Sequence, residues 1–152
     1  TYKGTETDII IPDTVISIGS YVFAGTSVTS IEIPNSVTSI GESAFISCSK
    51  LTNIVIPDSV TNIEAEAFEG CESLESIVLS NSLTSINIQT FARCSSLRNI
   101  TIPSSVTSIG YNAFNNCTSL TSITLEKGST LDPNNAEEWG INTAFCTVTK
   151  LT

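Results

Sequence analysis

Four cysteines spaced 23 residues apart are the side chains in this sequence with the widest chemical repertoire: Cys48, Cys71, Cys94 and Cys117. Thiolates act as nucleophiles and bind zinc, and cysteines in an oxidising compartment form disulfides. Each of the four lies three residues after a Phe and three residues before a Leu, which is typical of a position in an apolar core. We therefore predict buried, reduced thiols that pack as small hydrophobic groups and stay unreactive in the native state.

Two other roles for these cysteines have weaker support. A disulfide between neighbouring repeats is an open alternative, although stacked side chains rarely reach the torsion of about 90° that a bridge needs. A zinc site is disfavoured because ligands 23 residues apart are spread along a repeating structure and the sequence contains no His.

The absence of His also limits catalysis, because His is the commonest general base and part of every Ser-His or Cys-His arrangement. Six of the 15 carboxylates lie close together in the sequence: Asp58, Glu64, Glu66, Glu69, Glu72 and Glu75. A calcium site needs converging oxygens and a glycosidase needs one buried carboxyl group, and this spacing indicates neither. We interpret the group as a solvated face and predict no catalytic residue, no metal and no cofactor.

The net charge of −9 disfavours nucleic acid and anionic membranes as partners. Apolar runs are as short as Ile9–Ile11, so we predict no membrane insertion. The length of 152 residues, 40% of them hydrophobic, suits one domain with a core. The sequence has no Met and opens on no signal-like segment, so we interpret it as a processed or excised segment.

The cysteines belong to a larger pattern, because six columns of mostly aliphatic and aromatic residues repeat with the same step of 23. These columns begin at Val37, Ile40, Phe45, Leu51, Ile54 and Ile56. Sustained repetition at such a period indicates a fold of stacked units. A single unit has only one apolar face, so neighbouring units must stack to close a core.

One unit, here taken from residue 51 to 73, predicts three elements. Residues 54–56 lie in an alternating strand that ends at Pro57, and residues 60–63 form a second short strand. Residues 64–70 have the pattern of a short helical or 3₁₀ turn that Gly70 ends. We predict a parallel-β solenoid of 23-residue turns over residues 1–125, consisting of an opening turn and about five repeats.

The tail, residues 126–152, loses the period and is predicted to be an irregular C-terminal cap of the same domain. Trp139, Ile141 and Phe145 would cover the last regular layer, with Asp132 and two glutamates, at 137 and 138, on the solvated side. Two alternatives stay open: a disordered linker, or an exposed Trp139 that serves as a binding anchor.

The outward face of the longer strand is the candidate interaction surface. Because side chains alternate along a strand, the residues beside the inward Ile columns point to solvent. This surface comprises Ser30, Glu32, Asn53, Val55, Ser76, Val78, Asn99, Thr101, Ser122 and Thr124, with Trp139 as a further candidate. The strand residues include no aromatic side chain and no Arg, so they are a chemically plain surface.

The repeat itself resembles the BspA-type leucine-rich repeat family. The residues that carry the resemblance are LRNITIPSSVTSIGYNAFNNC, from Leu97 to Cys117, and VTSIEIPNSVTSIGESAFISC, from Val28 to Cys48. It extends roughly from Ile9 to Leu125, although Ser80 and Glu126 replace the usual Pro. The resemblance implies a leucine-rich repeat fold in secreted or surface-attached proteins of bacteria and some protists, which adhere to host proteins or other cells.

Our leading hypothesis is a non-catalytic cell-surface or secreted module that mediates adhesion by binding extracellular proteins of a host or neighbouring cell. The alternative is a structural protomer or stalk whose solenoid ends associate into a rod or filament, because unpaired strand edges associate unless they are capped. A third hypothesis is an accessory domain of a larger secreted enzyme. Two sequons, at Asn99 and Asn116, would matter only in a eukaryotic host.

Overall fold

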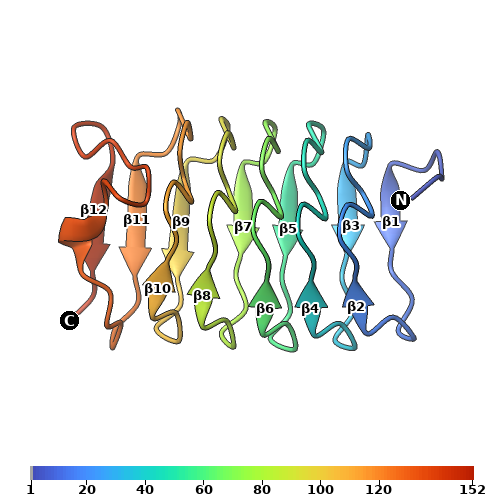
Figure 1. The fold of residues 1–152 in the computed structure, drawn as a ribbon, viewed down its shortest axis with the longest axis horizontal. Coiled ribbons are helices and arrows are strands. Elements are labelled where there is room, and N and C mark those ends of the chain that lie inside the picture. The colour runs from blue at the N-terminus through green and yellow to red at the C-terminus, as the bar shows by residue number, and fades with distance from the viewer. Residues whose placement is uncertain (1) are drawn as a thin grey trace.

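The computed structural model describes residues 2–152 as a row of stacked turns that forms a parallel-β solenoid, as predicted (Figure 1). Every strand pairing is parallel. The longer strands of the successive turns are β1 (Asp8–Ile10), β3 (Ser30–Glu32), β5 (Asn53–Val55), β7 (Ser76–Val78), β9 (Asn99–Ile102), β11 (Ser122–Leu125) and β12 (Thr147–Lys150). The shorter strands are β2 (Ser17–Ile18), β4 (Ser39–Ile40), β6 (Asn62–Ile63), β8 (Ser85–Ile86) and β10 (Ser108–Ile109).

The strand register places equivalent residues of neighbouring turns directly opposite one another. Ile54 faces Ile77, and Ile100 faces Ile123. These inward residues are buried whereas their strand neighbours are exposed in β5, β7 and β9 and half-buried in β11, which is the alternation that the sequence indicates. Each turn therefore adds one layer of the same composition to a continuous core.

A column of phenylalanines forms the centre of that core. The ring centroids of Phe23, Phe45, Phe68, Phe91 and Phe114 lie 5.1–5.7 Å apart in sequence order, and the interplanar angles do not exceed 15°. Tyr2 continues the column beyond Phe23 in a tilted arrangement. Stacked rings bury large apolar areas and add a favourable contact between layers, so the column couples each turn to its neighbours.

The third segment of each turn is not helical, so the predicted helical or 3₁₀ turn is wrong in the repeats. Alternate amides of the segment bond to the next turn: Phe45 N donates to Ala67 O at 2.8 Å, and Phe68 N donates to Thr90 O at 2.9 Å. The amides between them close isolated turns, as Ile46 N does by donating to Ser43 O at 3.1 Å. Residues with positive φ recur four positions apart in the segment, and the non-glycine ones include Ser43, Ser47, Glu66, Gln89, Arg93, Asn112 and Asn116. The short 3₁₀ helix that the structure does contain, η1 (Pro133–Asn135), lies in the tail.

The tail, residues 126–152, packs on the last regular turn and ends in β12, a strand that the sequence did not indicate. Trp139 is only 3% exposed and Ile141 is also buried, as a cap requires. Phe145, which we also expected to cover the core, is 78% exposed, so that part of the prediction is wrong. The burial of Trp139 likewise contradicts its assignment to the interaction surface, because the indole cannot contact a partner.

No helix among residues 2–152 is both long and apolar enough to cross a membrane.

Candidate functional site

The column of thiols lies against the phenylalanine column. Each Sγ–H donates to the carbonyl of the phenylalanine of the preceding turn: Cys48 to Phe23, Cys71 to Phe45, Cys94 to Phe68 and Cys117 to Phe91, at 3.0–3.3 Å. None of the five cysteines forms a disulfide within residues 2–152. Three members of the column are fully buried and Cys117 is half-buried.

Burial also sets the acidity of these thiols. Desolvation raises the pKa of Cys71 and of Cys94 well above the ordinary value, and it raises the pKa of Cys117 to about 12. A thiol that stays protonated at neutral pH is a poor nucleophile and a poor metal ligand. The column therefore has the geometry of a structural element, with its sulfurs hydrogen-bonded inside the core.

The acidic group of the third turn is spread over the surface. Glu69 lies 3.8 Å from Arg93, and Glu66 accepts a hydrogen bond from Ser43 Oγ at 3.2 Å. Glu64 accepts one from the backbone amide of Glu42 at 3.0 Å. In residues 2–152 no group of His, Cys, Asp or Glu converges in a way that could hold a metal ion. These carboxylates thus link neighbouring turns and do not form a ligand cage.

The structure brings the predicted strand residues together on one face. Ser30, Glu32, Asn53, Val55 and their counterparts in β7 and β9 are exposed, and Ser122 and Thr124 are half-buried. Two of them, Val55 and Val78, are aliphatic side chains that face solvent. Trp139 does not belong to this face because it lies in the core of the cap.

Two depressions interrupt this strand face where the backbone pairing breaks. The longer strands pair as β1–β3, β5–β7 and β9–β11–β12, so the ladder has a gap on either side of the β5–β7 pair. The first depression, of about 560 Å³, is lined by residues that include Glu32, Val55 and Asp58. The second, of about 460 Å³, has Val78 and Glu126 among its lining residues.

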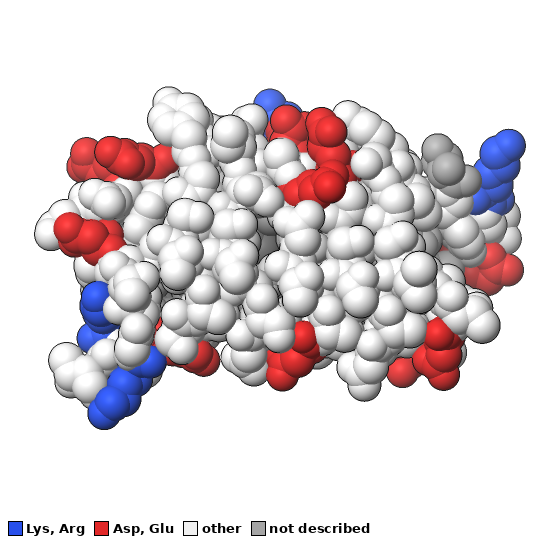
Figure 2. Space-filling model, turned by 60° about the horizontal axis from the view of Figure 1, so that its bottom comes forward, with Lys and Arg blue, Asp and Glu red and all other residues white. Residues whose placement is uncertain are grey.

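Carboxylates at the strand ends give these depressions a negative rim. Asp58 accepts hydrogen bonds from the backbone and side-chain nitrogens of Asn81 at 2.8 and 3.4 Å, and Glu126 accepts one from Ser104 N at 3.1 Å. Neither depression has Lys or Arg among its lining residues. Figure 2 shows separate acidic patches along both long edges of the molecule, with most of the visible basic side chains toward its two ends. Sequence reasoning missed Asp58, Asn81 and Glu126 as parts of this surface.

The N-terminal end presents an apolar surface. β1 pairs only with β3 among the described strands, so its other edge is free. Ile10 is 76% exposed beside a depression of about 280 Å³ that is lined by Tyr2, Ile9, Val15 and other apolar side chains. Such a surface is able to contact a further apolar layer.

The sequence matches the family model described as BspA type Leucine rich repeat region, with six copies over residues 2–121. No curated protein sequence matches the chain. Among solved structures, the leucine-rich repeat protein of T. pallidum is 34% identical, with a TM-score of 0.79 over 82% of this chain and 61% of its own length.

Two further structures are similar. The pneumococcal vaccine antigen PcpA is 31% identical, with a TM-score of 0.74 over 80% of this chain and 31% of its own. A leucine-rich repeat protein from Eubacterium ventriosum shares the fold at 22% identity, with a TM-score of 0.74 over 97% of this chain and 44% of its own. The chain thus spans less than two thirds of the length of each of these three proteins.

Proposed function

Because this chain belongs to the BspA-type leucine-rich repeat family, we propose that it is a non-catalytic module that adheres to proteins of a host or neighbouring cell, at the cell surface or in the extracellular space. The family supplies a repeat scaffold suited to protein interaction. A relative described as a vaccine antigen supports a location outside the cell.

The observation that carries the proposal is the pair of exposed valines that line the acidic depressions of the strand face. Val55 and Val78 are apolar contact points, and Glu32, Asp58 and Glu126 give their surroundings a negative potential. Complementary charge speeds association and selects partners, whereas the apolar contacts hold the complex together. The partner segment therefore combines an apolar residue with flanking Lys or Arg.

A variant that introduces positive charge tests this surface. Val55→Arg combined with Val78→Arg should weaken binding to a panel of immobilised extracellular-matrix proteins by at least about tenfold, because it adds bulk and repels a cationic partner. Ile88→Arg is the matched control, since Ile88 is exposed but does not line either depression. Binding should also weaken as salt is raised. Unchanged binding of the double variant would remove the strand face from the proposal.

The second candidate is a structural protomer that associates end to end. Its support is the free edge of β1 and the apolar surface around Ile10. Light scattering after size exclusion distinguishes the two candidates: an adhesion module stays monomeric at high concentration, whereas a protomer elongates as concentration rises. A monomer over the whole range contradicts the second candidate.

A further inference from the structure

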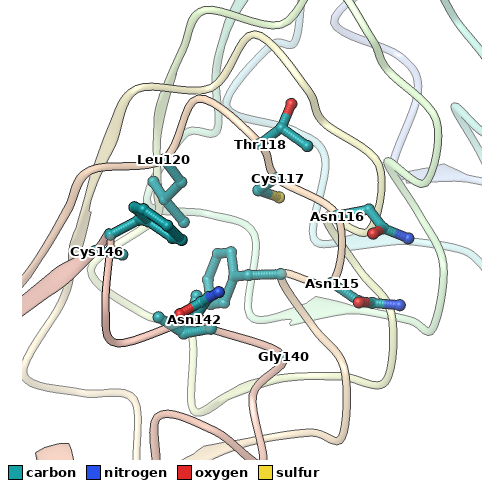
Figure 3. A pocket seen from close by; sticks show the side chains of 11 residues that line it. Asn115, Asn116, Cys117, Thr118, Leu120, Gly140, Asn142 and Cys146 are labelled. Carbon is teal, nitrogen blue, oxygen red and sulfur yellow. The ribbon is translucent and has the colours of Figure 1, made fainter.

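A cavity of about 320 Å³ lies between the last regular turn and the cap (Figure 3), and it shares no lining residue with the two depressions of the strand face. One wall is formed by Asn115, Asn116, Cys117 and Thr118 of the regular turn. Leu120 and the cap residues around Asn142 form the other. The volume is at the small end of known ligand pockets, which run from about 300 to 1,000 Å³.

The cavity exists because the cap takes a shorter path than a repeat does. Trp139 occupies the position that Ala113 has one turn earlier, because Phe114 N donates to Trp139 O as Phe91 N donates to Ala113 O. The first residue of β12, Thr147, pairs with Ser122 of β11. The cap therefore reaches its strand in eight residues, from Trp139 to Thr147, where the turn below uses nine, from Ala113 to Ser122. Gly140 allows the close approach that starts this path, because a Cβ there would lie 2.8 Å from Asn115 N.

The shorter path leaves a backbone donor without its usual acceptor. In three preceding turns the equivalent amides donate to the next turn: Ser47 N to Glu69 O, Gly70 N to Ala92 O and Arg93 N to Asn115 O, at 2.7–2.8 Å. Asn116 N makes no such bond to any residue from 2 to 152. Because the three earlier amides point along the solenoid axis toward the following turn, the Asn116 amide points toward the cap and its cavity.

A second donor comes from the cap. Asn142 Oδ1 accepts a hydrogen bond from Ala144 N at 3.0 Å, which orients the side chain and leaves Nδ2 available. In Figure 3 the Asn142 amide lies between the two walls, with its nitrogen toward the wall that carries Asn115. The side chains of Asn115 and Asn116 point away from the cavity in this view, so the wall that carries them contributes its backbone.

An exposed aromatic ring completes the site. Phe145 lines the cavity and is 78% exposed, beside the buried side chains of Leu120 and Ile141. None of the lining residues is charged, although the chain carries 21 charged side chains. The site has no cation for an anionic ligand, and its two donors would lose water without compensation if the ligand were a pure hydrocarbon.

We propose that this cavity binds one neutral sugar unit of a glycan. The C–H face of the sugar ring packs on Phe145, and two oxygens of the sugar accept hydrogen bonds from the Asn116 amide and from Asn142 Nδ2. A ligand of this size, held at one shallow site, binds with a dissociation constant on the order of 1 mM. The site is separate from the strand face, so it does not depend on the protein-binding proposal.

Saturation-transfer NMR on the whole chain tests the proposal with the methyl glycosides of glucose, galactose and N-acetylglucosamine. At least one should receive saturation, and N-acetylneuraminic acid, which is anionic, should receive none. Phe145→Ala should weaken binding at least tenfold. Tyr111→Ala is the matched control, because Tyr111 is 67% exposed and does not line the cavity.

Asn142→Asp isolates the hydrogen-bonding role. The variant keeps the oxygen that accepts from Ala144 N but replaces the free donor with a second acceptor, so binding should fall at least fivefold while the melting temperature stays unchanged. Transfer to no neutral sugar overturns the proposal. Equal transfer in wild type and Phe145→Ala also overturns it, since the contact would then lie elsewhere.

Discussion

Among residues 2–152, the two ends of the solenoid differ in the side chains that they expose, although β1, β2 and β12 each have an unpaired outer edge. At the N-terminal end, Ile10 and Ile16 are exposed and the outer edges of β1 and β2 are unpaired among residues 2–152. At the C-terminal end, residues 126–152 bury Leu131 and Trp139 over the last layer. Their outermost strand, β12, presents mainly threonines and Lys150 to solvent.

This difference shows what a repeat can and cannot specify. Identical units produce the same apolar layer at every level, so an end formed by a repeat exposes a layer of core composition. A cover must be apolar on one side and polar on the other, which the repeat sequence does not provide. The loss of period after Glu126 is therefore what permits the C-terminal end to be closed.

Substitutions in the interior should lower the free energy of unfolding more than substitutions at either end. Phe68→Ala should destabilise the protein by about 3–5 kcal/mol, because the ring is fully buried between two others and its removal leaves a cavity. Urea unfolding provides the measurement, and Phe91→Ala should behave alike. A loss below about 1 kcal/mol would show that the phenylalanine column does not hold the layers together.

The closed end should be nearly as sensitive. Trp139→Ala removes a buried indole that covers one layer, so we expect a loss of about 3 kcal/mol, at the low end for large aromatic truncations. Phe145→Ala is the comparison within the same segment, with an expected change within about 0.5 kcal/mol because its ring is exposed. Equal effects of the two substitutions would contradict the cap geometry.

The buried thiols of the interior predict that the stability of the protein depends on pH. The pKa values of buried Cys71 and Cys94 lie above the unfolded value of about 9.0, so the folded state retains protons that the unfolded chain releases. Their contribution to stability is complete below pH 9 and declines above it, by up to about 1.4 kcal/mol per pH unit for each thiol. Urea melts from pH 7 to 10.5 measure the decline.

Thiol labelling checks the same column by a second route. We expect the interior thiols to react only in denaturant, and half-buried Cys117, next to the cap, to react first as pH rises toward its pKa of about 12. Substituting Cys71 and Cys94 by Ala is the control, because it should flatten the pH dependence. Rapid native labelling of Cys71 or Cys94 would contradict their burial.

The open end should respond least in stability and most in association. Ile10→Glu with Ile16→Glu should change the unfolding free energy by no more than about 0.5 kcal/mol per site, because both side chains are exposed. Any end-to-end association should disappear in light scattering. Thr149→Glu, at the closed end, is the control and should leave the association state as it was. Association that survives the isoleucine substitutions would place its contact elsewhere.

The fold was predictable because each apolar column recurs once per turn, so register and inward face follow from the period. The turn conformation was not predictable in this way. Ser43, Glu66 and Gln89 have positive φ although none is Gly, and the local Ala-Phe pattern equally suits a helix. The hydrogen bonds that decide between the two run to the next turn, which local sequence does not reveal.

The candidate site was predictable only where it is periodic. Alternation placed Val55 and Val78 outward, but the breaks beside β5 and β7 depend on how the strands twist against one another. In the tail no column remains to separate inward from outward aromatics. Ala144-Phe145 has the Ala-Phe pair of the repeats, and yet Phe145 is exposed. Trp139 matches no repeat position and is buried.

The constant register of the turns also bears on how such a chain changes during evolution. A duplication or loss in the gene that adds or removes one complete unit leaves every inward column in phase, and both terminal surfaces keep their chemistry. The protein only lengthens or shortens, by about 4.8 Å for each unit. The period tolerates small changes, because Phe23 and Phe45 are 22 residues apart and still stack at 5.2 Å. The number of units, more than the length of each one, therefore sets the length of the strand face.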